Sequence, residues 1–432
     1  MRSGHVFVAL LLLLAADEAS ASTEFNGLFD ARSGAMGGTG AAFLDSAAAI
    51  PTNPALLDQI GKLTLTADAF FIAAQPTAPY TIRHLDPAGQ PYQTYESVRS
   101  PMTSALLPFV GGAYRLFDRV VVGVAAYPTM GLGTTAKYRP APDQFPEIEV
   151  ANKASQGLLE LGTAASVRVL DNLSVGLTWR VNYAVQKVSA PLAANNPVGV
   201  LLDPSSNPIT ADIDVSGFNF AGLQAGVFYK PLSNLRLGLT YRSKVVAVGT
   251  GTTTTKSPLS GETLVIDTRS AFTSPHTFRA GVALSVLEDK LLLAADFKYL
   301  MYAEAWKQIE TTTTQNGVTS TTATPAYWKD SVAVLLGGEF KASELFRPRL
   351  GYALVTSATN PAYAQQLMAP PGLSHLVTGG LGIKVLDGLN VDLSAGYVVL
   401  QSRVETATPY NAGVGIYGSH AGEFSLSVTY HM

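Results

Sequence analysis

The sequence repeats one unit along most of its length, a segment of about ten residues in which apolar and polar side chains alternate, followed by a connection. Leu389 and Val391 fall on one face of such a segment, while Asn390 and Asp392 fall on the other. A period of two residues predicts a β-strand. Residues 173–185 keep this alternation far longer than the five or six residues typical of a strand in a soluble protein. The chain is therefore predicted to be all-β, with unusually long strands.

The connections between these segments alternate between two lengths. Tight turns such as 117–119 and 386–388 separate some neighbours, whereas stretches of about twenty residues or more separate most of the others. Short turns at one rim and long loops at the other are the layout of a transmembrane antiparallel β-barrel in the outer membrane. The segments number about fourteen: 62–73, 105–116, 120–127, 157–169, 173–188, 218–229, 235–248, 276–286, 290–302, 331–341, 347–357, 375–385, 389–401 and 422–430. The intervening long stretches are predicted to be polar surface loops, extracellular in this layout: 74–104, 128–156, 189–217, 249–275, 303–330, 358–374 and 402–421.

Composition supports a membrane location. Charged residues make up 14%, against roughly 25% in soluble domains, and the mean hydropathy is +0.20. Beyond the N-terminus no run reaches the ~20 apolar residues of a spanning helix, and in lipid only helices and closed barrels satisfy every backbone polar group. Cysteine is absent, which removes thiolate metal sites, and the net charge of −3 argues against nucleic acid. No cofactor or metal is expected.

The N-terminus has the pattern of an export signal. Arg2 and His5 precede an apolar run at 6–16, and Ala19 and Ala21 occupy the positions that signal peptidase requires. A signal peptide at 1–21 is therefore predicted, and the mature protein is expected in the bacterial outer membrane.

Residues 34–57 consist almost wholly of small side chains. Such a stretch is often a flexible linker. Here it lies between a peptide that is removed and a barrel, so it has no two domains to join. We therefore interpret residues 22–61 as a hatch, or plug, inside the lumen and residues 62–432 as the transmembrane barrel.

Several motifs resemble one family. Residues 36–40 (MGGTG), followed by 53–55 (NPA), resemble the N-terminal hatch signature of the FadL family of outer-membrane transporters for long-chain fatty acids and other hydrophobic compounds. Residues 275–282 (PHTFRAGV), with Asp296, Tyr299 and Trp306 downstream, resemble its mid-barrel segment, and residues 349–352 (RLGY) a later strand. The resemblance spans the mature chain.

The resemblance implies a gate formed by the hatch, with Gly37, Gly38, Asn53, Pro54 and Ala55 at its two motifs. It also implies a first ligand site among the extracellular loops, a deeper apolar site in the barrel, and lateral release through a gap beside a kinked third strand. The gap is assigned to Gly123, Tyr127 and Pro128, at the predicted end of that strand, because Gly and Pro interrupt strand pairing. An ordinary strand end is the alternative.

Two further groups of residues are candidates for ligand contact. Met130, Leu132, Phe145 and Ile148 fall in a predicted long loop and are expected to form an apolar capture patch. Four inward-facing cations are candidates for binding a substrate carboxylate: Arg180, Arg242, Arg279 and Lys298. The alternative is a lattice of ion pairs inside the lumen with Glu160, Asp296, Glu339 and Asp392, which share the same face.

The sequence predicts a passive transporter rather than an enzyme, since no GxSxG or HExxH motif is present. His276 and His375 begin predicted strands near the extracellular rim and are interpreted as strand-end polar contacts. A general diffusion porin and a structural barrel are the alternative functions. The expected partners are a hydrophobic small molecule (long-chain fatty acid, alkane or aromatic hydrocarbon), membrane lipid with lipopolysaccharide, and the barrel assembly machinery, for which Tyr430 serves as the terminal aromatic. The barrel is expected to be a monomer.

Overall fold

The computed structural model describes residues 29–432. The predicted signal peptide (1–21) and the first residues of the predicted hatch lie outside the described residues. Among the described residues, no helix has both the length and the apolar character needed to cross a membrane.

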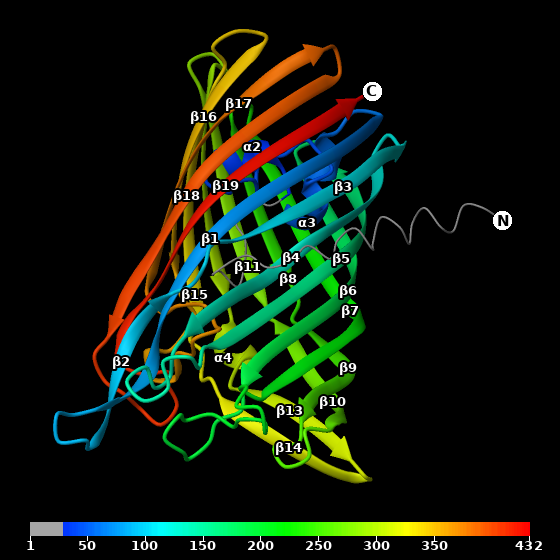
Figure 1. Cartoon of the computed structure of the whole chain (residues 1–432). Coiled ribbons are helices and arrows are strands. Elements are labelled where there is room, and N and C mark those ends of the chain that lie inside the picture. The colour runs from blue at the N-terminus through cyan, green and yellow to red at the C-terminus, as the bar shows by residue number, and fades with distance from the viewer. Residues whose placement is uncertain (1–28) are drawn as a thin grey trace.

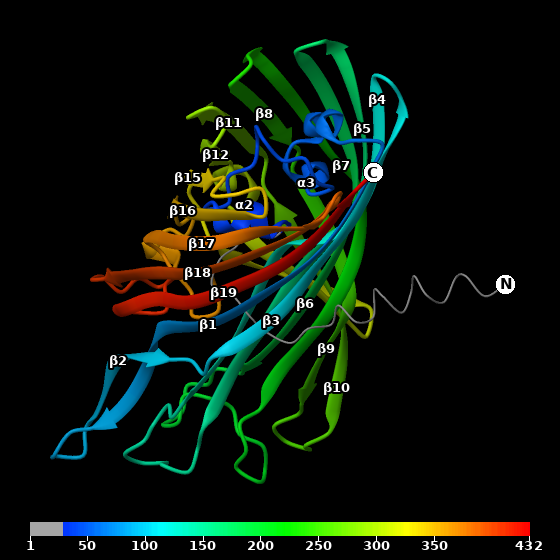
Figure 2. The same cartoon turned by 90° about the horizontal axis from the view of Figure 1, so that it is seen from above.

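Fourteen antiparallel strands form a closed ring (Figures 1 and 2). The ring closes where the last strand pairs with the first, from Thr64 opposite His431 to Thr77 opposite Gly418. The prediction of a closed antiparallel barrel of about fourteen strands is confirmed. In ring order the strands are β1 (Leu63–Leu85), β3 (Thr103–Phe117), β4 (Val120–Tyr138), β5 (Val150–Leu170), β6 (Leu173–Pro191), β7 (Thr210–Leu232), β8 (Leu235–Arg242), β11 (Thr277–Val286), β12 (Leu291–Leu300), β15 (Ser331–Phe340), β16 (Phe346–Thr356), β17 (Leu373–Leu386), β18 (Leu389–Val404) and β19 (Gly415–His431).

The long connections contain more regular structure than the sequence indicated. Five further strands extend the sheet at that end of the barrel: β2 (Pro91–Arg99), β9 (Val245–Lys256), β10 (Thr263–Ser274), β13 (Gln308–Gln315) and β14 (Val318–Pro325). Threonine-rich runs read as polar loop pair as strands instead, because β-branched side chains suit a pleated surface even without an apolar face. The predicted segment 235–248 is likewise divided into β8 and β9.

The two faces of the wall differ as the alternation requires. On β1, Leu65 and Phe71 are exposed, whereas Thr66, Asp68 and Phe70 are buried. Large apolar side chains are exposed in the same way on strands around the ring. In a membrane barrel this outward apolar face lies against lipid, which explains why so much apolar surface remains uncovered by protein.

Residues 29–60, here called the inner segment, lie within the ring near the rim of short turns (Figures 1 and 2). The inner segment contains α2 (Ala31–Ala35), α3 (Ala49–Thr52) and the 3-10 helix η1 (Pro54–Gln59). Asp30 caps α2 by accepting from the Arg32 N–H. The Met36, Leu44 and Ile50 side chains have no solvent exposure. The small residues at 34–57 thus let a folded chain fill a narrow space, while the domain boundary at 61 and any role as a hatch stay predictions.

Candidate functional site

Asn53 joins two parts of the inner segment to the wall. Its Nδ2 donates to the carbonyl oxygens of Ala41 (2.8 Å) and Val227 (3.1 Å), and its Oδ1 accepts from the Ala55 N–H (3.2 Å). Asn53 is fully buried, so these bonds satisfy an amide that would be costly to leave unpaired. Pro54 occupies the first position of η1, where a missing N–H costs nothing. The NPA motif is thus a fixed corner of the inner segment.

Gly37 and Gly38 form a turn that contacts two different strands. Their φ values of 70° and 80° lie in the left-handed region, which glycine adopts without steric cost. The Gly37 N–H donates to Thr378 Oγ1 on β17 (2.9 Å), while the Gly38 carbonyl accepts from Arg279 Nη2 on β11 (2.6 Å). The turn therefore needs glycine for its conformation and its backbone for its contacts.

Glycines of the wall lie where the inner segment approaches most closely, and sequence reasoning missed them. A Cβ on Gly337 would lie 2.5 Å from the Met36 carbonyl oxygen, and a Cβ on Gly281 would lie 2.7 Å from the Ala41 Cβ. Three pairs face each other across their ladders: Gly176 with Gly226, Gly238 with Gly281, and Gly337 with Gly351. The available signal was glycine recurring at inward positions of strands that otherwise carry larger side chains.

Inward charges of β5, β6 and β8 form a buried ion-pair group. Arg180 Nη1 lies 3.1 Å from Glu160 Oε2, and neither side chain is solvent-exposed. Arg242 pairs with the same carboxylate, and Arg180 Nη2 also donates to the Ser243 carbonyl (2.6 Å). Breaking a buried ion pair leaves a charge without compensation. We therefore interpret Arg180 as a structural residue that joins β6 to Glu160 and Ser243.

Arg279 and Asp296 link the wall to the inner segment. They form an ion pair between β11 and β12, with Arg279 Nε 2.8 Å from Asp296 Oδ2. The same oxygen accepts from the backbone N–H groups of Gly40 and Ala41, each at 3.0 Å. This ion pair and the backbone of residues 38–41 therefore form one network.

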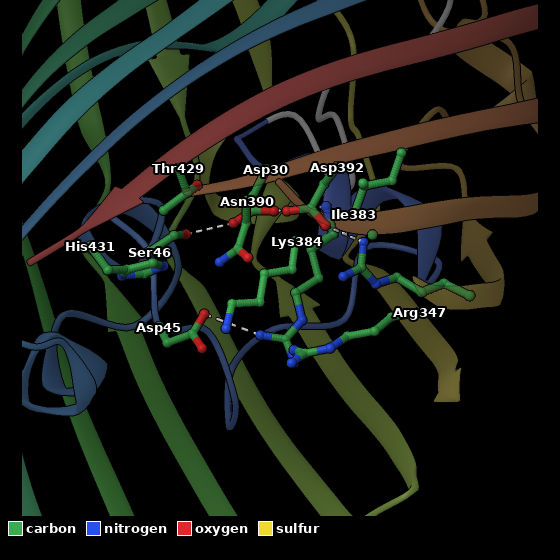
Figure 3. A pocket seen from close by; sticks show the side chains of 13 residues that line it. Asp30, Asp45, Ser46, Arg347, Ile383, Lys384, Asn390, Asp392, Thr429 and His431 are labelled. Atoms are coloured by element: carbon green, nitrogen blue, oxygen red, sulfur yellow. Dashed lines mark hydrogen bonds and ion pairs between the residues drawn. The ribbon is translucent and has the colours of Figure 1, made fainter. Parts of the chain in front are cut away.

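A second network lies at the short-turn rim, around a small polar cavity (Figure 3). Arg32 of α2 donates to Glu339 (2.8 Å), and Arg349 bridges Glu339 and Asp392, each at 2.6 Å. Asp30 accepts from the Ser46 hydroxyl (2.5 Å) in the same cavity. Burial raises the pKa of Asp30 to about 6, with the Asp392 charge adding to the effect. Cations and carboxylates compensate one another here, which marks a structural contact rather than an anion site.

Asp58, which sequence reasoning did not single out, anchors the end of the inner segment. Its carboxylate accepts from Arg168 Nε (2.9 Å), Arg115 Nη1 (3.3 Å) and the Ser174 hydroxyl (2.7 Å). Burial alone would raise the pKa of Asp58, but these hydrogen bonds and positive charges hold the pKa below its usual value. Three strands are thereby tied to η1.

A cavity lies in the lumen on the long-loop side of α3. Three of the four candidate carboxylate-binding cations line it, namely Arg242, Arg279 and Lys298, while Arg180 does not. Apolar surface comes from Phe29, Pro51 and Tyr302, and the remaining lining is Thr52, Thr129, Gln224, Thr240, Ser274, Pro275 and Thr277. The lining includes no carboxylate, so a cationic and an apolar surface share one space.

The ladder between β3 and β4 is shorter than either strand. It extends from Phe117 opposite Val120 to Val110 opposite Ala126. Beyond this point β3 continues along β1 and β4 continues along β5, a divergence here called the β3–β4 seam. Phe29 packs there against Tyr127 (ring centroids 5.1 Å apart) and Phe109 (6.2 Å). Aromatic side chains thus lie where backbone pairing stops.

Two details of the third strand differ from prediction. The strand does not end at Pro128, because a register shift between Pro128 and Met130 accommodates the proline and β4 continues to Tyr138. Gly123 pairs with Ala113 on one side and Ala164 on the other, so it lies within intact ladders. Tyr127 and Pro128 are the predicted gap residues that lie at the seam.

Comparison with known proteins adds an independent observation. Residues 15–431 match the family model of outer membrane protein transport proteins (OMPP1/FadL/TodX). The chain belongs to this family. As a FadL/TodX-family member it is an outer-membrane protein and a transport protein, not an enzyme.

Solved structures agree on the fold. A FadL homologue of Pseudomonas aeruginosa is 19% identical, with a TM-score of 0.73, 95% of this chain and 100% of that chain covered. The toluene transporter TodX of Pseudomonas putida is 17% identical, with a TM-score of 0.69 and coverage of 95% and 99%. The monoaromatic hydrocarbon channel CymD is 18% identical, with a TM-score of 0.65 and coverage of 93% and 96%. No curated protein sequence matches the chain.

The predicted capture patch is only partly a loop feature in this FadL/TodX-family chain. Met130 and Leu132 lie in β4, so their assignment to a loop is wrong; the strand simply runs past the proline that was expected to end it. Phe145 and Ile148 do lie in the connection after β4. There they pack against Val198 and Leu202 of the next long connection, which forms a cluster between two loops.

Proposed function

We propose that this protein is a passive channel for long-chain fatty acids or similar amphiphilic hydrophobic molecules. The observation that carries the proposal is the position of Phe29, which lines the lumenal cavity and also packs against Tyr127 at the β3–β4 seam. One aromatic side chain therefore borders both the lumenal cavity and the place where pairing between β3 and β4 stops. A ligand would pass from the extracellular loops to the cavity and leave sideways through the seam.

The cations of the cavity favour a ligand with an anionic head group. Arg242 and Arg279 each share their charge with a carboxylate behind them, yet the cavity lining itself carries only positive groups. Guanidinium and ammonium groups bind carboxylates through charge-assisted hydrogen bonds. The related TodX and CymD carry names that refer to toluene or monoaromatic hydrocarbons, ligands that would not need these cations. The cationic lining is the reason to prefer an acid.

The decisive measurement compares two ligands in one variant. Lys298→Met removes a cavity cation while keeping side-chain length, and it should lower binding and uptake of labelled oleate about tenfold, because a charge-assisted hydrogen bond contributes roughly 1.5–3 kcal/mol. Uptake of toluene should stay unchanged. Lys187→Met is the control, since Lys187 is exposed and pairs with Asp214 at the surface. Equal loss of both ligands, or of neither, would contradict the carboxylate role.

Passive transport also requires that the inner segment moves. It fills the lumen near the short-turn rim and contacts most of the wall, so we assign it the role of a hatch whose displacement connects cavity and seam. Deletion of residues 46–55 should abolish oleate uptake while the barrel still assembles. A deletion variant that transports normally would refute the gating role. A large steady ion current through the intact protein in planar bilayers would instead favour a diffusion porin.

A further inference from the structure

Three histidines on the outer surface each contact a tyrosine of the neighbouring strand. Tyr241 Oη lies 2.8 Å from His276 Nδ1, Tyr352 Oη lies 2.7 Å from His375 Nδ1, and Tyr397 Oη lies 3.4 Å from His420 Nδ1. The six residues, here called the Tyr–His girdle, come from β8, β16, β17, β18, β19 and the residue before β11. The same contact recurs at three places around the ring, which one chance strand-end contact does not explain.

The contact has the same register wherever both residues lie in strands. Tyr352 is opposite Val377, two residues beyond His375, and Tyr397 is opposite Gly422, two residues beyond His420. Diagonal neighbours of this kind lie on one face of a sheet within reach of aromatic side chains. Tyr241 and Tyr397 are exposed by 36% and 53%, on the apolar outer face of the wall. The girdle therefore points to the membrane and not to the lumen.

The three histidines lie at one height. His276 directly precedes the ten-residue strand β11, and eleven residues follow both His375 in β17 and His420 in β19 before the short-turn rim. Ten residues rise about 33 Å along a strand, which a tilt of roughly 40° reduces to about 25 Å along the membrane normal. The apolar band of such barrels is also about 25 Å tall. The histidines thus lie at the extracellular edge of the band, where lipid head groups begin.

The hydrogen bonds of His276 indicate which ring nitrogen carries the proton. The Lys244 backbone N–H donates to His276 Nδ1 at 3.1 Å, and a backbone amide can only donate. Nδ1 is therefore an acceptor, and the proton of the neutral ring lies on Nε2. At His375 and His420 a tyrosine hydroxyl that donates to Nδ1 gives the same arrangement. Among the described residues, Nε2 of these three histidines has no hydrogen-bond partner, so each can donate outward.

A cation lies on the same outer face next to one member of the girdle. Gln75 is directly opposite His420, and two residues further along β1, Thr77 is opposite Arg99 of β2. Positions two residues apart share a face, which places Arg99 outward and beyond His420 towards the long-loop rim. Arg99 is exposed, and no described residue forms an ion pair with it. Histidine, amide and guanidinium donors are thus adjacent there.

We propose that the Tyr–His girdle binds the phosphate groups of lipid head groups in the outer leaflet, which in this membrane are those of lipopolysaccharide. Aromatic rings alone suffice to place a barrel at a membrane interface. The histidines add an oriented N–H at the depth where a head-group phosphate lies, and the tyrosine hydroxyl fixes the ring that carries it. Phosphate is the anionic acceptor of lipid A, whereas the acyl region offers none. This surface is independent of the proposed transport route.

The test uses the whole protein in detergent and lipid A with or without its phosphates. The wild type should bind diphosphorylated lipid A about tenfold more tightly than dephosphorylated lipid A in a titration read by native mass spectrometry. The triple variant His276→Phe, His375→Phe, His420→Phe keeps the rings and should lose most of this preference. His431→Phe is the matched control, because His431 lies at the opposite rim beside Thr64 and should leave the preference intact.

Two outcomes overturn the proposal. A triple variant that keeps the tenfold preference shows that other groups bind the phosphates, and a wild type without any preference shows that the girdle only anchors rings at the interface. Folding is checked for each variant by heat-modifiable mobility. If the triple variant does not fold, Tyr241→Phe, Tyr352→Phe, Tyr397→Phe removes only the orienting hydroxyls. That variant should reduce the tenfold preference for diphosphorylated lipid A to about threefold. An unchanged preference would contradict the role of the girdle.

Discussion

The wall formed by β15 to β18 and the wall formed by β3 and β4 hold the inner segment in different ways. On the first side, Arg32 pairs with Glu339, the Gly37 N–H bonds to Thr378, and the ladder between β15 and β16 runs from Glu339 to Ala333. On the second side, Phe29 and Ile50 pack against aromatic and aliphatic side chains, and the ladder stops early. Among the described residues, the hydrogen bonds between this side and the inner segment are those of Arg115 at the short-turn rim.

This difference indicates where movement is least costly. Separating a buried hydrogen bond or ion pair leaves polar groups unsatisfied, at about 1–3 kcal/mol or more each. Apolar side chains can slide past one another while keeping most of their contact, since dispersion has little directionality. A displacement of the inner segment should therefore pivot on the β15–β18 side and open space at the β3–β4 seam.

The largest expected effect comes from removing the close fit on the pivot side. In Gly351→Ala the new Cβ would overlap the backbone of Met36 and Gly37, and neither backbone atoms nor strand can yield easily. We expect the inner segment to lose its place, at a cost above about 3 kcal/mol, while the barrel still forms. Protease cleavage of the inner segment and raised ion conductance would report this.

Gly422→Ala provides the control, because a Cβ on Gly422 meets no atom within 4 Å. It should behave as wild type in both assays. If Gly351→Ala also behaves as wild type, the tight contact on the pivot side does not hold the inner segment.

An intermediate effect is expected at the rim anchor. Asp58→Asn weakens the contacts to Arg115 and Arg168 and should destabilise docking of the inner segment by about 1–3 kcal/mol at pH 7. Since the pKa of Asp58 is lowered in the folded protein, its stabilising contribution exists above the usual carboxyl pKa of about 4 and disappears as the pH falls through the folded value. The difference between variant and wild type should therefore shrink below about pH 4, measured by unfolding in lipid vesicles.

Asp30→Asn supplies the opposite case within the same inner segment. The pKa of Asp30 is raised to about 6, so wild type loses stability as the pH rises through that value. The stability of the Asp30→Asn variant should therefore rise relative to wild type between about pH 4 and pH 6, whereas that of Asp58→Asn should fall relative to wild type as the pH rises towards about 4. Identical pH profiles for both variants would contradict the assigned environments.

The same contrast explains what the sequence could reveal. Alternation in segments such as 389–401 predicts a strand because it repeats one local rule, and the ring of fourteen follows from repeating it. The parity of that alternation also placed Glu160, Arg180 and Asp296 on the inner face. The pairing of charges inside the lumen could therefore be predicted from the sequence.

Contacts between segments that lie far apart in the sequence could not be predicted from it. The inward positions of Gly176 and Gly351 could be read from the alternation, but the sequence does not show that Ala55 and Gly37 come to lie against them. The β3–β4 seam likewise forms because β3 and β4 diverge while β3 stays paired with β1 and β4 stays paired with β5. Pro128 suggested a strand end, but a one-residue register shift was enough to absorb it.

The smallest expected effect concerns the β3–β4 side of the wall, where the inner segment is held by apolar contacts. Phe29→Leu keeps much of the apolar volume but removes the ring contacts to Tyr127 and Phe109, which contribute about 0.5–1.5 kcal/mol. If the seam side is where the inner segment yields, uptake of labelled ligand should rise about twofold to fivefold. Phe43→Leu is the matched control, since Phe43 packs under Arg32 at 5.1 Å on the pivot side and should leave uptake unchanged. Equal changes in both variants would mean that the two sides of the wall resist displacement alike, and the pivot would have to be sought elsewhere in the ring.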